Sequence, residues 1–303
     1  MRRFASIGLS TMLKPPIVTS PSVGGMNPVI MRMVTGFMPP SSGRVTIGGH
    51  DVAEEPIAAK RLIGYLPENA AAYPDMTVHG FLNFAAELRG MTTAERKAAV
   101  DRVVEMCFLQ GVLHQSVETL SKGYRHRTCF AQSIIHDPQV LILDEPTDGL
   151  DPNQKHEVRT LIRRMGETKA IIFSTHILEE VEAVCSRAII IDRGTIVANG
   201  TPAELKQEIG GDVIVMETKD PERLAGRIRT QFGVDTQVLE TQVRIEKEHG
   251  HRFVMDLVQS FPGEIDSVSI AKPSLEDVFI RRTGHRFWTE EAKESFERKD
   301  TKR

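Results

Sequence analysis

Short apolar runs rich in β-branched residues alternate with amphipathic helical patterns, and this alternation constrains the fold more than any other feature of the sequence. It is typical of βαβ units, which build a mostly parallel sheet with helices on its faces. The sequence therefore predicts an α/β fold. The expected strands are 44–49, 62–66, 140–145, 170–175 and 188–200, the last with a tight turn at Arg193-Gly194.

Two stretches do not follow this alternation of strand and helix patterns. Residues 77–118 hold two amphipathic helical patterns, the second opening on Thr92-Thr93 as an N-cap, so we expect a helical insertion between strands. From 212 to 284, the order strand, helix, two strands, helix, strand and closing helix resembles a small ferredoxin-like α+β unit. Residues 285–303 are highly charged and are expected to form a solvated tail.

Composition excludes several classes of protein. With 303 residues, 26% of them charged, and a formal net charge of -3, the chain has no excess of basic residues that would indicate nucleic-acid binding. The three cysteines are far apart and favour reduced thiols in a cytoplasm. No apolar run approaches the roughly 20 residues of a membrane helix. The short apolar patch after Arg2-Arg3 ends at Lys14-Pro15-Pro16, which disfavours a signal peptide.

The stretch "VLILDEPTDGLDP", residues 140–152, is the first candidate for chemistry. A buried strand that ends in Asp144 and Glu145 places two acids at the carboxyl edge of a parallel sheet, where doubly wound folds bind ligands. One carboxylate can hold Mg²⁺ and the next can orient an attacking water. Taken alone, the pair is more simply interpreted as two acids that cap a sheet edge.

Two further motifs are weaker when each is taken alone. His176 ends the strand pattern "FSTH", where a histidine is commonly structural. "LSKGYRHR" places Ser121 and Gly123 at the start of a helix, where a serine N-cap and free backbone N–H groups can bind an anion. The alternative is a capped helix with no ligand.

Together and in this order, the motifs resemble the nucleotide-binding subunit of an ABC transporter, over about Met31 to Gly200. "LSKGY" resembles the family's signature, "VLILDE" its Walker B strand, "GLD" its D-loop and "STH" its switch histidine. The ABC-2 exporter branch, with its gliding-motility and copper-processing types, is most similar. The resemblance implies a P-loop NTPase-like ABC domain over 31–205, with 77–118 as its helical subdomain and 1–30 outside it.

The family's residue roles follow from the matching positions. The resemblance implies that Glu145 is the general base or water-orienting carboxylate, that Asp144 lies on the Mg²⁺ shell, and that His176 contacts the γ-phosphate of ATP. In the family two cassettes sandwich ATP, so the partner's nucleotide would meet Ser121, Gly123 and Tyr124, and Asp151 would align the two sites. Glu68 stands where most of the family has glutamine, and a carboxylate there adds repulsion near phosphate.

The phosphate-binding loop departs from the family. The lysine position holds Asn27, which supplies no charge, and the Ser/Thr position holds Pro28, which has neither hydroxyl nor N–H. Gly24 and Gly25 are present, but adjacent glycines are common in turns. Pro15-Pro16 is expected to block a central strand. We therefore expect the fold to lack its first strands, with a vacancy or an irregular segment between 170–175 and 188–192.

Three functional readings remain open. The first is the ATPase subunit of an ABC-2 type exporter, cytoplasmic and peripheral on the inner face of the membrane, working with a permease and a second cassette in a homo- or heterodimer. The second is an inactive partner cassette, or a truncated or frameshifted product in which residues 1–30 come from another reading frame. The third, a soluble ABC protein of DNA repair or translation, lacks its usual paired cassettes or coiled-coil insertion here.

Overall fold

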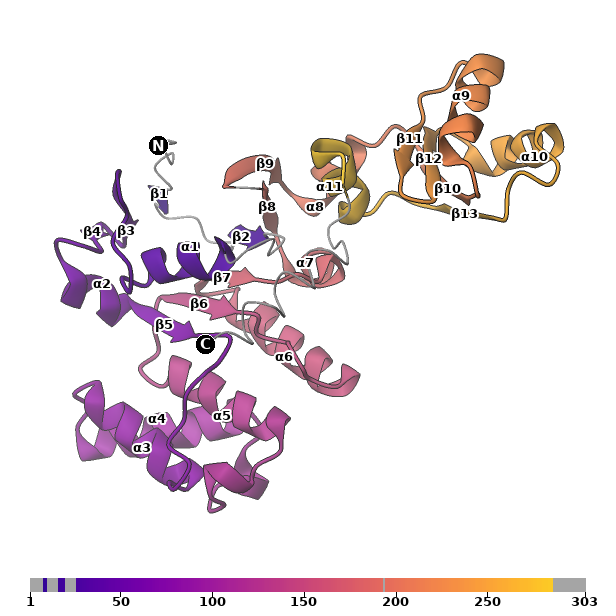
Figure 1. Ribbon diagram of the computed structural model, residues 1–303. Helices are drawn as coiled ribbons and strands as arrows, with labels where there is room; N and C mark the ends of the chain where they lie inside the picture. Colours follow the sequence, from indigo (N-terminus) through magenta and orange to yellow (C-terminus); the bar gives the residue numbers. More distant parts are fainter. Residues whose placement is uncertain (1–7, 10–15, 20–25, 193, 286–303) are drawn as a thin grey trace, which may run out of the picture. The chain divides into compact units, whose positions relative to one another are not determined.

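The structure is a computed structural model that describes residues 8–9, 16–19, 26–192 and 194–285 (Figure 1). The chain divides into two compact units, Met1–Ile189 and Ile190–Arg303, and each is described by itself. Residues 286–303 of the expected tail and the turn residue Arg193 lie outside the described residues. Within the described residues, no helix has the length and apolar character that a membrane crossing requires.

The centre of the first unit is a parallel sheet in the order β5-β6-β7, with Leu66 paired to Leu143 and Leu143 to Phe173. All three of these side chains are fully buried, as expected for near-continuous apolar strands covered on both faces. The strands are β5 (Ile63–Leu66), β6 (Val140–Asp144) and β7 (Ala170–Ser174). The flanking helices are α1 (Met26–Val34), α2 (Pro56–Leu62), α6 (Pro152–Met165) and α7 (Leu178–Val184).

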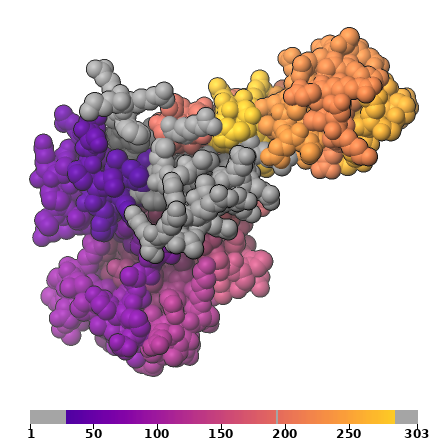
Figure 2. Space-filling model, viewed as in Figure 1, coloured from indigo at the N-terminus to yellow at the C-terminus, as the bar shows by residue number. Residues whose placement is uncertain are grey.

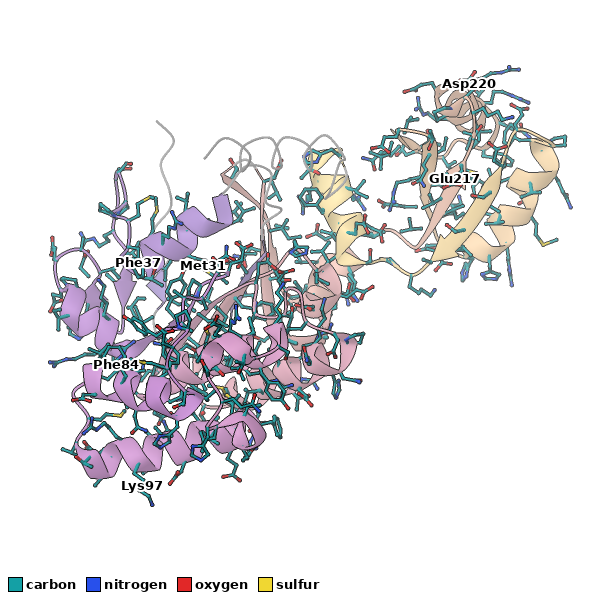
Figure 3. All side chains as sticks on the ribbon, turned by 60° about the horizontal axis from the view of Figure 1, so that its bottom comes forward. Met31, Phe37, Phe84, Lys97, Glu217 and Asp220 are labelled. Atoms are coloured by element: carbon teal, nitrogen blue, oxygen red, sulfur yellow. The ribbon has the colours of Figure 1, made fainter. Side chains whose placement is uncertain are left out.

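The helical insertion is present as expected between β5 and β6. It contains α3 (Val78–Leu88), α4 (Thr93–Met106), the short 3-10 turns η1 (Gln110–Val112) and η2 (Val117–Thr119), and the start of α5 (Lys122–Ile134). Thr92 forms a capping box with Glu95, which satisfies backbone donors at the start of α4. Helices α3, α4 and α5 share one apolar core, and their segment forms a continuous mass in Figure 2. Lys97 points away from α4 into solvent, whereas Met31 of α1 is buried (Figure 3).

The segment before α1 corrects one expectation. Strand β2 (Pro16–Thr19) lies against β7 and neighbours β8 (Arg187–Asp192) in the sheet order β2-β8-β9, so the position expected to be vacant or irregular holds a short strand. Pro16 is the first residue of this strand, a place that proline tolerates, and the following residues Ile17, Val18 and Thr19 are all β-branched. The local preference of these three residues therefore outweighs the proline pair.

A second small sheet differs in length from the expectation for 44–49. The order is β1-β3-β4, with β1 (Gly8–Leu9) parallel to β3 (Thr46–Ile47) and β4 (His50–Asp51) antiparallel to it. The strand ends early because Gly48 and Gly49 have φ of 57° and 89°, the left-handed conformation that glycine adopts without strain. These two glycines turn the chain from β3 into β4.

The second unit contains the expected ferredoxin-like arrangement. Its sheet runs β11-β12-β10-β13 with antiparallel pairs, and α9 and α10 pack on it. Its core joins Ile214 and Ile245 of the sheet to Leu224 and Leu257 of the helices. The elements are β9 (Thr195–Gly200), α8 (Pro202–Gln207), β10 (Asp212–Glu217), α9 (Pro221–Phe232), β11 (Gln237–Leu239), β12 (Gln242–Lys247), α10 (Gly250–Ser260), β13 (Ser267–Ala271) and α11 (Leu275–Thr283).

The closing helix α11 is tied to the rest of the second unit by ion pairs. Arg244 of β12 contacts Asp277, and Arg282 lies 2.5 Å from Glu208 at the end of α8. Asp277 also completes a capping box with Ser274, so one carboxyl group both caps the helix and joins it to the sheet. The helix is thereby fixed at its start and near its end.

Candidate functional site

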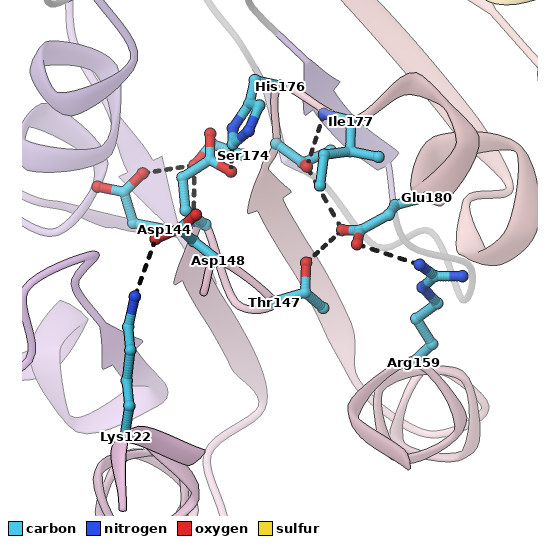
Figure 4. Close-up of polar contacts among 11 residues, drawn as sticks. Lys122, Asp144, Thr147, Asp148, Arg159, Ser174, His176, Ile177 and Glu180 are labelled. Carbon is cyan, nitrogen blue, oxygen red and sulfur yellow. Dashed lines mark hydrogen bonds and ion pairs between the residues drawn. The ribbon is translucent and has the colours of Figure 1, made fainter. Parts of the chain in front are cut away.

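The candidate site begins where β6 and β7 end side by side. Asp144 is paired in register with Ser174, and the Ser174 hydroxyl donates a hydrogen bond to the Asp144 carboxyl (Figure 4). The next backbone N–H, that of Glu145, lies 3.2 Å from the Ser174 carbonyl oxygen. The continuous apolar run of β6 buries the strand, so Asp144 is held at its end with only 5% of its surface exposed.

Glu145 and His176 meet across the same two strand ends. Nδ1 of His176 lies 2.9 Å from Oε2 of Glu145, and both side chains are more than half buried. The backbone of Glu145 has φ of 47°, a left-handed conformation that is strained for a residue with a side chain. Such strain, on the order of 1–3 kcal/mol, is concentrated at functional sites because the surrounding structure must hold it.

Burial sets the electrostatics of these groups. It raises the pKa of Asp144, against the hydrogen bond from Ser174 and the positive charge of Arg32. It also raises the pKa of Glu145, against its hydrogen bond with His176. The same hydrogen bond raises the pKa of His176, because the imidazolium is favoured beside a carboxylate. A carboxyl group with a raised pKa is a better proton acceptor at neutral pH than an exposed one.

Glu68 joins the site from β5, two residues after that strand ends. Burial raises its pKa, and the nearby acids Asp144, Glu145 and Asp148 raise it further. Carboxylate oxygens such as these are ligands that Mg²⁺ accepts in proteins. Within the described residues no three His, Cys, Asp or Glu side chains could enclose a metal by themselves.

The start of α5 is a capped helix N-terminus, as expected. The Ser121 side chain accepts a hydrogen bond from the Tyr124 N–H at 3.4 Å. Gly123 is buried, and a Cβ there would lie 2.4 Å from the side chain of Gln154, so a larger residue would have to displace the end of that side chain. The guanidinium of Arg127 lies 4.8 Å from the centre of the Tyr124 ring. The helix start is therefore shaped by contacts to its own chain.

One ion pair links the start of α5 with the segment 144–151. Nζ of Lys122 lies 3.6 Å from Oδ2 of Asp148, and both side chains are mainly exposed. Asp151 is the N-cap of α6, and its side chain accepts a hydrogen bond from the Gln154 N–H at 3.0 Å. Asp151 thus has a structural task within its own chain, whatever it does at an interface.

The positions that the resemblance assigns to the phosphate-binding loop lack the residues that this loop needs. Gly24 and Gly25 lie outside the described residues, while Asn27 and Pro28 fall in the first turn of α1, which begins at Met26. A proline in a first helical turn is tolerated because that N–H has no intrahelical partner. Neither residue type offers the cation or the hydroxyl that a triphosphate with Mg²⁺ needs. Asn27 and Pro28 therefore do not fit the phosphate-binding role that the resemblance gives to their positions.

Three features of the site were missed by sequence reasoning. Ser174 holds Asp144, Lys122 reaches Asp148, and buried Glu180 contacts the loops after β6 and β7. The signal for Ser174 was available, because aligned parallel strands place "LD" of 143–144 beside "FS" of 173–174. No pattern distinguishes Glu180 from its neighbour Glu179.

Comparison with protein families gives two matches. The ABC transporter family matches residues 29–148, and the C-terminal domain of DrrA1-3-like ATP-binding proteins matches residues 200–283. The first match begins just after Pro28, close to the point where the resemblance in the sequence begins.

The linearmycin resistance ATP-binding protein LnrL of Bacillus subtilis is 32% identical over 84% of this chain and 85% of its own length. The chain belongs to the ABC transporter ATP-binding proteins. The daunorubicin resistance ATP-binding protein DrrA3 of Streptomyces coeruleorubidus is 31% identical over 86% of the chain and 84% of its length. A solved ATP-binding subunit of an ABC transporter aligns with TM-score 0.57 and 26% identity, over 65% of this chain and 83% of that one. The expected fold class is confirmed, with the addition of short strands before α1.

Proposed function

We propose that this chain is the ATP-binding subunit of an ABC-2 type exporter, a peripheral protein on the cytoplasmic face of the membrane. It would act with a separate permease and with a second cassette. The relatives named above are resistance ATP-binding proteins, which supports a role in export. The observation that carries the proposal is the strained, buried Glu145 held against His176 beside Asp144.

For ATP hydrolysis, each residue at the carboxyl ends of β6 and β7 would have one role. Glu145 orients a water molecule and accepts its proton, since its raised pKa brings it closer to neutrality. His176 fixes the carboxyl group of Glu145 and carries positive charge toward the γ-phosphate. Asp144, steadied by Ser174, would hold Mg²⁺, which neutralises phosphate charge when bound. The start of α5, with Ser121, Gly123 and Tyr124, would face the nucleotide held by the second cassette.

A second candidate is an inactive partner cassette, or a product with a displaced reading frame. It is favoured by Asn27 and Pro28, since a chain without the phosphate-binding cation and hydroxyl binds nucleotide poorly on its own. In that case the chain would give its signature face to a complete cassette and would not hold ATP itself.

Two assays of the purified chain separate these functions. Phosphate release from Mg-ATP is measured for the chain, for Glu145→Gln and for the control Glu105→Gln, an exposed acid of α4. The exporter subunit predicts hydrolysis that Glu145→Gln lowers by about 10²–10⁴-fold, the typical contribution of a general base, while Glu105→Gln leaves it unchanged.

The inactive-partner function predicts a different outcome. The chain alone would release no phosphate above the Glu145→Gln level and would bind a fluorescent ATP analogue only when mixed with a relative that has a complete glycine-rich loop. Absence of binding in both conditions would contradict both candidates.

A further inference from the structure

Glu180 is an acid that the mechanism above does not use, although it is one of the most buried polar residues of the first unit. It lies on α7 with 1% of its surface exposed, whereas its neighbour Glu179 is exposed. A buried carboxyl group is costly unless hydrogen bonds and opposite charge compensate for the loss of water. The partners of Glu180 therefore indicate why it is there.

Three partners from three different segments converge on this carboxyl group. The Thr147 hydroxyl donates to Oε2 at 2.5 Å, and the Thr175 hydroxyl donates to the same oxygen at 3.4 Å (Figure 4). Nη2 of Arg159, on α6, forms an ion pair with Oε1 at 3.3 Å. The Thr175 oxygen also accepts from the Ile177 N–H at 3.0 Å, which fixes the loop after β7.

The positions of the two threonines relate this network to the site. Thr147 follows Glu145 by two residues, and Thr175 directly precedes His176. Both threonines are essentially inaccessible to solvent, at 1% and 0% exposure. The two loops that carry Glu145 and His176 are thus both fastened to one buried group, and the strained backbone of Glu145 needs such support.

We propose that Glu180 is a positioning residue that sets the Glu145–His176 contact by anchoring the loops after β6 and β7 to α7 and α6. Its importance for catalysis rests on the proposed function, but the anchoring itself is a property of the chain without nucleotide. Removing the acid would leave two buried hydroxyl groups and a partly buried guanidinium without their acceptor. Both loops would then loosen together.

The test uses the full chain without nucleotide. Ring-nitrogen NMR of His176 reports its contact with Glu145, and amide hydrogen exchange reports the opening of 145–149 and 175–177. Glu180→Gln is expected to shift the His176 signal and to raise exchange in both loops by more than tenfold, while exchange in α3 and α4 stays unchanged. Glu179→Gln is the matched control and is expected to change neither measurement.

Two variants of Thr175 keep the test decisive if the Glu180 variant folds poorly. Thr175→Val removes the hydroxyl at constant size and should reproduce the shift, whereas Thr175→Ser keeps the hydroxyl and should retain the native signal. The proposal is overturned if Glu180→Gln lowers thermal stability but leaves the His176 signal and loop exchange unchanged. Absence of ATP hydrolysis in the native chain would contradict the proposed function and leave this result intact.

Discussion

Two connections between a strand and a helix in the first unit differ sharply. The one from β6 to α6 holds Asp144, Glu145 and Asp151 in specific hydrogen bonds, and its neighbouring loop supplies His176. The one from β2 to α1 joins the same kinds of element, yet Asn27 and Pro28 open its helix. Both strands precede a helix, but among the described residues only the connection after β6 carries acids in side-chain hydrogen bonds.

The comparison separates what places a strand from what binds a ligand. A short β-branched run such as Ile17-Val18-Thr19 suffices for a strand beside β7, because sheet position depends on backbone pairing and apolar packing. Phosphate binding depends instead on single polar side chains at fixed positions, which no neighbouring residue can replace. A strand's place in the fold and phosphate binding beside it are therefore separate requirements.

The largest expected effect concerns the strand that carries the acids. Leu143→Ala truncates a fully buried side chain directly before Asp144, and we expect it to lower the free energy of unfolding by about 2–5 kcal/mol. Urea unfolding followed by circular dichroism measures it. The control Ile196→Ala, at a β9 position that is 47% exposed, should change stability by less than about 0.5 kcal/mol. Equal losses in both variants would show that buried Leu143 contributes no more to stability than exposed Ile196.

The next effect tests the β2–α1 connection directly. Asn27→Lys combined with Pro28→Ser returns a cation, a hydroxyl and a backbone N–H, and hydrogen bonds to charged groups contribute about 1.5–3 kcal/mol. We expect affinity for Mg-ATP, measured by titration calorimetry, to rise by roughly 10- to 150-fold. The control Asn27→Gln with Pro28→Ser lacks the charge and should gain much less. No gain in the lysine variant would mean that the connection cannot present its residues to a phosphate.

Much of the edge after β6 and β7 could be predicted from the sequence, because carboxyl ends of adjacent parallel strands meet at one place. That rule predicts the place of Asp144 and Glu145, and the family resemblance adds His176 to them. The rule could not find Glu180, since two consecutive glutamates on a short helix differ in burial only through the helix's rotation against its neighbours. The prediction at β2 was wrong for another reason. Proline was expected to block a central strand, but Pro16 is the first residue of β2, where proline is tolerated.

A smaller effect concerns the charge that Glu68 adds to the edge. Its pKa is raised by burial and by neighbouring acids, so the folded state binds this proton more tightly than the unfolded chain. The associated stability is present below the ordinary glutamate pKa of about 4.3 and is lost as pH rises through the raised folded value. Glu68→Gln removes this loss. We expect the variant to be more stable than the native chain at pH 7.5 and to lose this advantage at pH 4. The difference is on the order of 1 kcal/mol or less, because solvent screens the partly exposed group.

Urea unfolding of both proteins at the two pH values measures the difference, and Glu105→Gln, an exposed acid of α4, serves as the control. Addition of Mg²⁺ should reduce the advantage of Glu68→Gln, because a bound cation offsets the same repulsion. A variant that is equally stable relative to the native chain at both pH values would show that Glu68 lies outside the field of Asp144 and Glu145.

The smallest effect is expected where α5 meets the segment after β6. Lys122 and Asp148 are 68% and 51% exposed, and exposed pairs contribute about 0–1 kcal/mol. In a double-mutant cycle of Lys122→Ala and Asp148→Asn, we expect a coupling energy below about 0.5 kcal/mol that vanishes in 0.5 M salt. A weak ion pair would allow Lys122 to release Asp148 and contact a phosphate of the nucleotide instead. A coupling energy well above that value that persists in high salt would contradict this expectation. It would show that α5 is held firmly to the connection after β6, which would sharpen the difference between that connection and the one from β2 to α1.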